Sequence, residues 1–484
     1  MSEKIEIKAL MQKSGVKFGT SGARGLAAAM TNGVCHAYTT GFLSFLEEIG
    51  ELESKNESVA IAGDLRPSTG AIMAAVAQAI RDKGYNPINC GRIPSPAVAL
   101  FGLEQGIPAI MVTGSHIPAD RNGIKFNKCS GEILKRDEAL MMAQRVDYQP
   151  DVSVEPLPVE DTRALEGYRA RYLSLFPADC LSGLKIGFYQ HSAVGREVLA
   201  ELLVKLGAEV VPLGFSEHFV PVDTEAIRPE DVVLARDWAQ QHQLDGIIST
   251  DGDSDRPLLS DEQGKWLRGD ILGILAASYL EADSISTPVS SNSALEACER
   301  FAQVHRTKIG SPFVVAAMQE ALADHEQGVV GYEANGGFLT ASAFPLFGGE
   351  LAPLPTRDAL LPVLAALLLA KAQDVSLATL VAQLPARFTA SDRIEAYPTE
   401  QSTAIIERYA SVEAIEHDFA PLFGAVDSVD RTDGVRITFS SSEVVHLRPS
   451  GNAPEFRCYN EAQSEARVEQ MQALTMALLM ELKG

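Results

Sequence analysis

Cysteine is scarce in this chain of 484 residues, and none of its six cysteines forms a Cys-x-x-Cys pair. A zinc-finger site or a thioredoxin-like redox motif is therefore not expected. Unpaired thiols scattered through a long chain are typical of a reducing compartment. The sequence therefore predicts a cytoplasmic protein.

A long hydrophobic run is also missing. The longest apolar stretch, 360–370, is about half the length needed to cross a bilayer and contains Pro362. Because proline is tolerated in the first turn of a helix, this stretch predicts a buried helix. The first fifteen residues carry charges throughout and lack the apolar core of a signal peptide. We expect neither a membrane span nor secretion.

Positive charge is in deficit. Lys and Arg number 41 against 64 Asp and Glu, which gives a net charge of −23. Such a chain repels nucleic acids and anionic membranes, so neither is an expected partner. A small anionic substrate would require basic side chains to gather in one cleft.

Strand-like and helix-like segments alternate through most of the sequence, a pattern typical of α/β units with largely parallel sheets. A polar, Pro-rich stretch, 147–159, predicts a linker. After a second change of composition around 372–391, two strands and a helix predict a small antiparallel α+β domain. The expected strands are 58–62, 108–112, 184–188, 245–249, 328–332, 434–439 and 443–447, and the expected helices are 69–83, 196–206, 270–281, 312–325 and 461–483.

The motif DGDSDR directly follows the strand 245–249. Its three carboxylates, Asp251, Asp253 and Asp255, alternate with other residues and can turn toward one hard cation such as Mg²⁺. A solvated acidic turn is the plainer alternative. An EF-hand fails, because Arg256 replaces the required glycine and a strand precedes the loop.

The motif TGSHIP also follows an apolar strand. Ser115 would be exposed there for covalent chemistry, with His116 beside it, although Thr-Gly-Ser is often only a turn. A little further on, Lys125 follows an Asn-Gly turn and could exchange a proton if it is partly desolvated. The alternative is a surface lysine.

Three further loops suit a phosphorylated sugar. RPSGNAPEFR places two arginines around a turn whose amides could bind an anion. YEANGG places a carboxylate and an amide where they could hold neighbouring hydroxyls. KFGTSGARG, which begins at Lys17, is a Gly-rich loop with a basic residue near each end, a possible phosphate cradle. Each of these signals is weak by itself.

Together, these five motifs resemble the α-D-phosphohexomutase family, in the family's order and over essentially the whole chain. The resemblance implies an α/β fold of four domains: three similar α/β mixed-sheet domains and a C-terminal α+β domain, around a central cleft. We place these domains at 1–152, 153–258, 259–375 and 376–484.

The resemblance also implies the chemistry. Ser115 would carry a phosphoryl group, donate it to a hexose phosphate and recover one from the hexose 1,6-bisphosphate intermediate. Mg²⁺ would be held by Ser115 and the three aspartates. The expected acid–base residues are Lys125, Arg24 and His116, and the expected substrate-binding residues are Arg256, Lys308, Glu333, Asn335, Arg448, Ser450, Gly451, Asn452 and Arg457.

The expected activity is a phosphomannomutase reaction on mannose 6-phosphate and mannose 1-phosphate, supplying nucleotide-sugar synthesis, by a monomer or homodimer. Three positions depart from the family's usual loops, namely Asn335, Gly337 and Asn452. Glucose or glucosamine phosphates therefore remain alternative substrates. A non-catalytic phosphosugar-binding protein and a metal-dependent phosphatase are the rivals from other classes.

Overall fold

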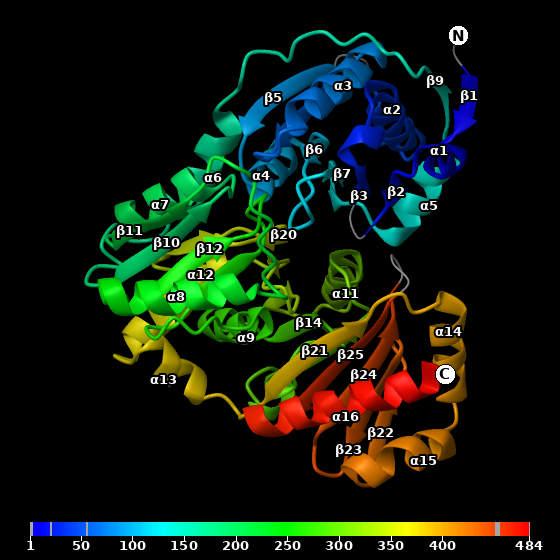
Figure 1. The fold of residues 1–484 in the computed structure, drawn as a ribbon. Helices are drawn as coiled ribbons and strands as arrows, with labels where there is room; N and C mark the ends of the chain where they lie inside the picture. Colours follow the sequence, from blue (N-terminus) through cyan, green and yellow to red (C-terminus); the bar gives the residue numbers. More distant parts are fainter. Residues whose placement is uncertain (1–2, 20–21, 55–56, 451–454, 484) are drawn as a thin grey trace.

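The computed structural model describes residues 3–19, 22–54, 57–450 and 455–483. It contains four sheet-based units that follow one another in an arc, so that the first and the fourth face each other (Figure 1). The first three are α/β units with mixed sheets, and the fourth is an antiparallel sheet with helices, as the sequence predicted. No helix within the described ranges is long and apolar enough to cross a membrane.

The first unit is built on a mixed sheet with the strand order β2-β3-β7-β6-β4-β5. Its core is formed mainly by α2 and α3 against the apolar sides of β4, β6 and β7. The elements are β1 (Glu3–Glu6), α1 (Ile7–Ser14), β2 (Lys17–Phe18), β3 (Gly22–Leu26), α2 (Asn32–Glu48), β4 (Ser58–Gly63), α3 (Thr69–Asp82), β5 (Asn86–Arg92), α4 (Ser95–Gln105), β6 (Ala109–Val112), β7 (Arg121–Lys128), β8 (Gly131–Glu132), α5 (Lys135–Ala143) and β9 (Arg145–Tyr148).

The second unit has the strand order β11-β10-β12-β13. Because β13 pairs with β12, this sheet extends two residues past 258, where we placed the domain boundary. The elements are α6 (Arg163–Leu173), β10 (Lys185–His191), α7 (Arg196–Lys205), β11 (Glu209–Phe215), α8 (Pro229–His242), β12 (Gly246–Thr250) and β13 (Pro257–Ser260).

The third unit has the strand order β15-β14-β16-β17-β20. The elements are α9 (Gly269–Tyr279), β14 (Ser284–Pro288), α10 (Ala294–Ala297), β15 (Gln303–Thr307), α11 (Ser311–Ala323), β16 (Val329–Tyr332), β17 (Phe338–Thr340), β18 (Phe344–Leu346), β19 (Gly349–Leu351), β20 (Leu354–Asp358), α12 (Leu360–Ala372) and α13 (Leu377–Ala382).

The first three sheets share one local arrangement. In each, four strands that follow one another in the chain pair in the same way. The first strand is parallel to both the second and the third, and the third is antiparallel to the fourth. The connection from the third to the fourth strand therefore occupies the same place three times. These connections are β6–β7, β12–β13 and β16–β17, and they carry TGSHIP, DGDSDR and YEANGG.

The fourth unit is an antiparallel sheet with the order β21-β25-β24-β23-β22. The predicted terminal helix was wrong at its start: it begins at Glu465 rather than 461, because Phe456–Ala462 forms a strand between β21 and β24. The elements are β21 (Phe388–Ile394), α14 (Thr399–Arg408), α15 (Val412–Phe423), β22 (Val426–Asp430), β23 (Val435–Phe439), β24 (Val444–Pro449), β25 (Phe456–Ala462) and α16 (Glu465–Lys483).

The apolar run 360–370 is the buried helix α12, with Pro362 in its first turn, as predicted. Leu364 in this helix has no solvent exposure. We expect Leu364→Ala to lower the free energy of unfolding by about 2–5 kcal/mol, because the cavity left behind collapses only partly. Chemical denaturation measures this change. Val204→Ala, at a side chain that is 56% exposed, should shift it by less than about 0.5 kcal/mol; equal effects would contradict the burial of α12.

Candidate active site

Ser115 lies at the start of the β6–β7 connection and faces the second unit. Its φ is +55°, in the left-handed region that non-glycine residues rarely adopt. The residue is fully buried, and its Oγ donates a hydrogen bond to Oδ2 of Asp251 at 2.5 Å. The connection therefore presents the hydroxyl to the acidic loop of the next unit.

The three aspartates of the β12–β13 connection form a buried cluster. One oxygen from each of Asp251, Asp253 and Asp255 lies within 4.8 Å of the others. Burial, together with the other two carboxylates, raises the pKa of Asp251 well above its usual range. Oδ1 of Asp253 and Oδ1 of Asp255 are buried and accept no hydrogen bond from any residue that the structure describes. This arrangement is unlike a solvated turn and fits a hard divalent cation, which prefers oxygen ligands.

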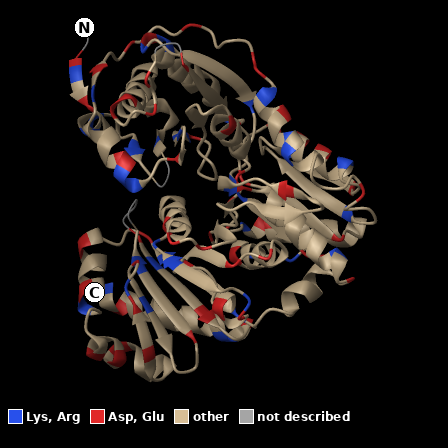
Figure 2. Cartoon of the chain, turned by 180° about the vertical axis from the view of Figure 1, so that it is seen from behind, with Lys and Arg blue, Asp and Glu red and all other residues tan. Residues whose placement is uncertain are grey.

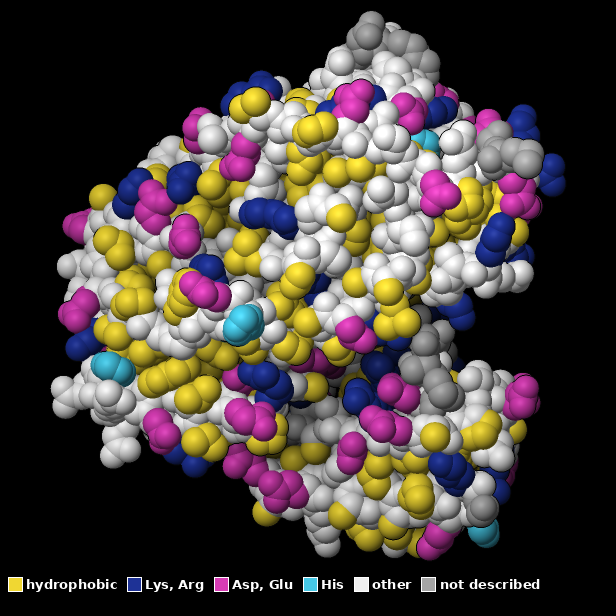
Figure 3. All heavy atoms as spheres, turned by 45° about the horizontal axis from the view of Figure 1, so that its top comes forward, with side chains coloured by type: hydrophobic (Ala, Val, Ile, Leu, Met, Phe, Trp, Pro, Cys, Tyr) yellow, Lys and Arg dark blue, Asp and Glu magenta, His cyan; other side chains and the backbone are white. Residues whose placement is uncertain are grey.

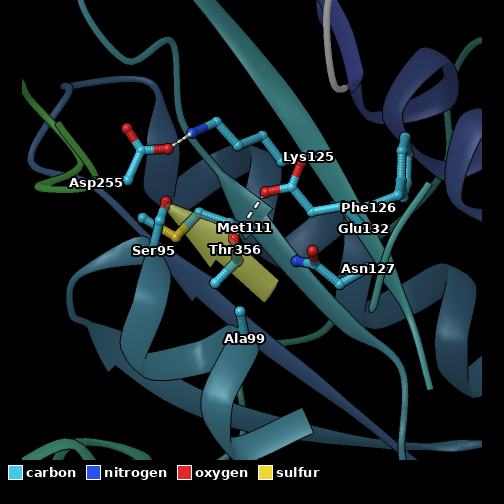
Figure 4. Close-up of a pocket in the computed structure, with 9 residues that line it drawn as sticks. All are labelled: Ser95, Ala99, Met111, Lys125, Phe126, Asn127, Glu132, Asp255 and Thr356. Carbon is cyan, nitrogen blue, oxygen red and sulfur yellow. Dashed lines mark hydrogen bonds and ion pairs between the residues drawn. The ribbon is translucent and has the colours of Figure 1, made fainter. Parts of the chain in front are cut away.

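Lys125 projects from β7 toward the same cluster (Figure 4). Its Nζ lies 2.5 Å from Oδ2 of Asp253 and 2.6 Å from Oδ2 of Asp255. The residue is 8% exposed, so it is not a surface lysine. Ser95, at the start of α4, donates to the same Asp253 oxygen at 2.5 Å. The cluster is thus partly neutralised, and Lys125 is held next to the loop that Ser115 contacts.

A small cavity of about 10 Å³ lies behind Lys125, room for roughly one water molecule (Figure 4). One wall is Glu132 of β8, a buried carboxylate that accepts hydrogen bonds from the hydroxyls of Thr356 at 2.7 Å and Ser311 at 3.1 Å. These bonds join the first unit to the third beneath the site.

His116 lies beside the Ser115 hydroxyl, with Nδ1 3.3 Å from Oγ. Two arginines, Arg256 and Arg24, lie near the imidazole. Burial and the neighbouring Arg256 guanidinium lower the pKa of His116 to about 3. Nη1 of Arg256 donates to Nδ1 of His116 at 3.0 Å, which places the imidazole proton on Nε2. Arg24, on β3, is paired in register with Gly123 of β7. Burial, with Arg256 and Arg357 nearby, lowers its pKa to about 10.

The YEANGG loop is joined to the acidic cluster by Arg357, which was not expected from the sequence. Arg357 on β20 is 2% exposed; its Nε lies 3.0 Å from Asp255 and its Nη1 lies 3.2 Å from Oε2 of Glu333. Asn335 is nearby in the chain, but its Oδ1 accepts from the backbone of Gly337 at 3.0 Å. Its side-chain carbonyl therefore shapes the loop.

The fourth unit, which faces the first, contributes two arginines. Arg448 of β24 and Arg457 of β25 are directly opposite each other in the antiparallel register. Like charges in such positions repel, and each guanidinium has a carboxylate neighbour. Nη2 of Arg457 lies 3.2 Å from Oε2 of Glu455. Nε of Arg448 lies 2.9 Å from Oδ2 of Asp433. Figure 2 shows Lys and Arg positions gathered on the strand ends of this unit that point toward the first unit, and Figure 3 shows Lys and Arg side chains around the hollow between the two units.

For the remaining predicted substrate residues, the contacts described below are with residues outside the aspartate cluster. The backbone N–H of Ser450 donates to the carbonyl of Glu455 at 2.9 Å. Lys308 is exposed in the loop after β15, and the next residue, Ile309, donates its N–H to Asp433 at 2.9 Å. Gly451 and Asn452 lie outside the described residues.

Three side chains of this centre were missed from the sequence: Ser95, Arg357 and Arg66. Arg66 follows β4 in the polar loop 64–68, the same place relative to its strand as the recognised motifs. That position was a usable signal. Arg357 and Ser95 stand in ordinary strand and helix-start sequences, where no local pattern distinguishes them.

Four family descriptions match consecutive parts of the chain. They are the α/β/α domains I, II and III and the C-terminal domain of phosphoglucomutase/phosphomannomutase, at residues 15–149, 170–264, 268–388 and 378–478.

Full-length relatives and solved structures agree with this match. A phosphomannomutase of Salmonella muenchen is 45% identical, covering 94% of this chain and 94% of the relative. A phosphomannomutase of Sinorhizobium fredii is 43% identical, covering 96% and 99%. The structure of a phosphoglucomutase/phosphomannomutase family protein from Burkholderia thailandensis superposes with a TM-score of 0.73, at 20% identity, over 96% of this chain and 97% of that one.

Proposed function

Because this chain belongs to the phosphoglucomutase/phosphomannomutase family, we propose that it interconverts mannose 6-phosphate and mannose 1-phosphate. The observation that carries the proposal is the hydrogen bond from Ser115 Oγ to the buried aspartate cluster, with Lys125 on the same carboxylates. The two relatives named phosphomannomutase, at 43% and 45% identity over nearly the full length, support mannose as the sugar.

We propose that Asp251, Asp253, Asp255 and an oxygen on Ser115 hold Mg²⁺. The fit rests on three buried carboxylates whose ligand oxygens lie within 4.8 Å of one another, and on Oδ1 of Asp253 and of Asp255, which accept no hydrogen bond from the described residues. The ion supplies charge neutralisation for phosphoryl transfer when it is bound.

Ser115 is the proposed phosphoryl carrier. The hydroxyl of the sugar phosphate attacks the phosphorus on Ser115, the bond from phosphorus to Oγ breaks, and Lys125 exchanges the proton between the two oxygens. A hexose 1,6-bisphosphate results. After it reorients, its other phosphoryl group returns to Ser115 by the same step in reverse. Arg24, His116 and Arg256 surround the transferring group, where their hydrogen bonds orient it.

The non-reacting phosphate is proposed to bind in the fourth unit, at Arg448, Ser450 and Arg457 with the loop that contains Gly451 and Asn452. The opposed arginines support this assignment, since two neighbouring guanidinium groups offer enough N–H donors to bind a phosphate beside their present partners, Asp433 and Glu455. Glu333, Asn335 and Lys308 are the proposed contacts to the sugar. The six cysteines are unpaired, which supports a reducing compartment such as the cytoplasm.

A panel of sugar phosphates tests the substrate. We expect kcat/KM for mannose 1-phosphate to exceed that for glucosamine 1-phosphate by at least about tenfold, because a polar group without a partner in the site costs more than about 1 kcal/mol. Equal values for mannose and glucose 1-phosphates would make the enzyme dual-specific. Release of inorganic phosphate without formation of an isomer would contradict the mutase proposal and favour a phosphatase.

A further inference from the structure

Arg66 is a buried arginine directly beneath the loop that carries Ser115. It lies after β4, and its side chain has no solvent exposure. Its guanidinium has five N–H donors, and all of them are used. Nε bonds to Asp64, Nη1 to the carbonyls of Pro118 and Arg121, and Nη2 to the carbonyls of Ser115 and Ile117, at 2.6–3.2 Å. One planar cation therefore holds three backbone carbonyls of the β6–β7 connection and that of the first residue of β7.

The start of the same loop is shaped to admit this cation. A Cβ on Gly114 would lie 2.6 Å from Cζ of Arg66, so only glycine allows the guanidinium this close. Thr113 Oγ1 donates to Asp64 at 2.7 Å and accepts from the backbone N–H of Ser115 at 2.7 Å. Asp64 thereby links the cation to the left-handed backbone of Ser115.

Phe219 covers the face of the same guanidinium from the second unit. Its ring centroid lies 4.0 Å from Cζ of Arg66, in the segment after β11. The ring also lies against the acidic loop, since a Cβ on Gly252 would be 3.1 Å from two of its carbons and 2.7 Å from the carbonyl oxygen of Ser115. Arg66 and Phe219 therefore form a stack between the nucleophile loop and the aspartate loop.

We propose that Arg66 and Phe219 are positioning residues that set the placement of Ser115 Oγ relative to the aspartate cluster. Arg66 fixes the shape of the loop through the four carbonyls, and Phe219 fixes the loop against the second unit. In-line phosphoryl transfer depends strongly on such placement, and an error of about 1 Å can cost about 100-fold in rate. The proposal rests on the proposed role of Ser115 as phosphoryl carrier.

The first test is Arg66→Lys, which keeps the charge but offers three donors from one atom instead of five in a plane. We expect kcat to fall by about 10- to 100-fold, with KM for mannose 1-phosphate changing less than about threefold, since substrate binding is not touched. The matched control is Arg196→Lys. Arg196 also stacks on a phenylalanine, Phe215 at 4.2 Å, and donates to two carbonyls, but these belong to His191 and Ser216 and not to the loop that carries Ser115.

The second test is a set of variants at Phe219. Phe219→Leu removes the aromatic face. It should lower kcat by about 3- to 30-fold, the rate factor that corresponds to the energy of a cation–π contact shielded from water. Phe219→Tyr keeps the face and should restore kcat to within about twofold of the wild type. Phe215→Leu is the control, because Phe215 is 56% exposed and stacks on Arg196 rather than on Arg66.

The outcomes separate this proposal from the proposed function. Wild-type mutase turnover and an added phosphoryl group on Ser115, read by intact mass, are measured first, and their absence would overturn both. If the wild type is active, equal kcat for the Arg66→Lys and Arg196→Lys enzymes overturns the positioning role alone. So does a rise in KM without a fall in kcat. Should Arg66→Lys fail to fold, the Phe219 set decides: equal activity of its Leu and Tyr variants refutes the proposal.

Discussion

Replacement of Ser115 by alanine is expected to lower kcat for mannose phosphate interconversion by at least about 1000-fold, the size of effect seen when a nucleophile is deleted. The physical reason is that a methyl side chain at this position offers no oxygen to carry the phosphoryl group. Asp251 would also lose the hydrogen bond that it now accepts from Oγ at 2.5 Å. The measurement is mannose 6-phosphate formation from mannose 1-phosphate, with intact mass to detect the phosphorylated enzyme.

The control for this variant is Ser130→Ala in the same unit. Ser130 is exposed, and its hydroxyl donates to Glu51 at 2.7 Å, away from the aspartate cluster. This variant should keep its activity to within about twofold, as surface substitutions usually shift stability by less than about 0.5 kcal/mol. If the Ser115→Ala enzyme retained a tenth or more of wild-type turnover, the phosphoserine mechanism would be wrong.

Asp253→Asn is the second variant with a large expected effect. Amide oxygen is a weaker ligand than carboxylate for a hard cation, so we expect Mg²⁺ to bind less tightly and kcat to fall by at least about 100-fold. Stability gives an independent readout. Saturating Mg²⁺ should raise the unfolding midpoint of the wild type, because it binds the folded state, and should raise that of the variant much less.

Asp237→Asn provides the matched control, since Asp237 is exposed on α8. It should keep both the activity and the Mg²⁺-dependent rise in midpoint. Chelation of divalent metal should abolish wild-type turnover, and added Mg²⁺ should restore it. An Asp253→Asn enzyme with the wild-type response to Mg²⁺ would exclude the aspartate cluster as the metal site.

The alternation of short apolar strands with helices was predictable because it depends on the spacing of apolar residues within each segment. The strand at 58–62 and the helix at 69–83 correspond to β4 and α3, and the run at 360–370 is the buried helix α12. The start of the last helix was not predictable in this way. Phe456–Ala462 becomes a strand because it pairs with β21 and β24, and that pairing is invisible to local sequence.

The site was predictable to the extent that its residues stand in conspicuous loops. Ser115, Lys125 and the three aspartates were all named from glycine-rich or acidic motifs, and the structure brings them together. Arg66 and Arg357 were not named. Arg66 stands in a polar loop directly after β4, which was a usable signal, whereas Arg357 stands in an ordinary strand. Both acquire their roles only from partners contributed by other loops and strands.

By itself, the sequence determined the net charge of −23, the apolar segments that become strands and helices, and the five loops to which we assign the chemistry. Only the tertiary structure decided that the connections β6–β7, β12–β13 and β16–β17 meet at one site. It also decided which basic side chain pairs with which carboxylate there. Lys125 pairs with Asp253, and Arg357 pairs with Asp255, across more than 100 residues of chain. Such pairs depend on how separately folded units pack against one another, which local propensity and patterning do not encode.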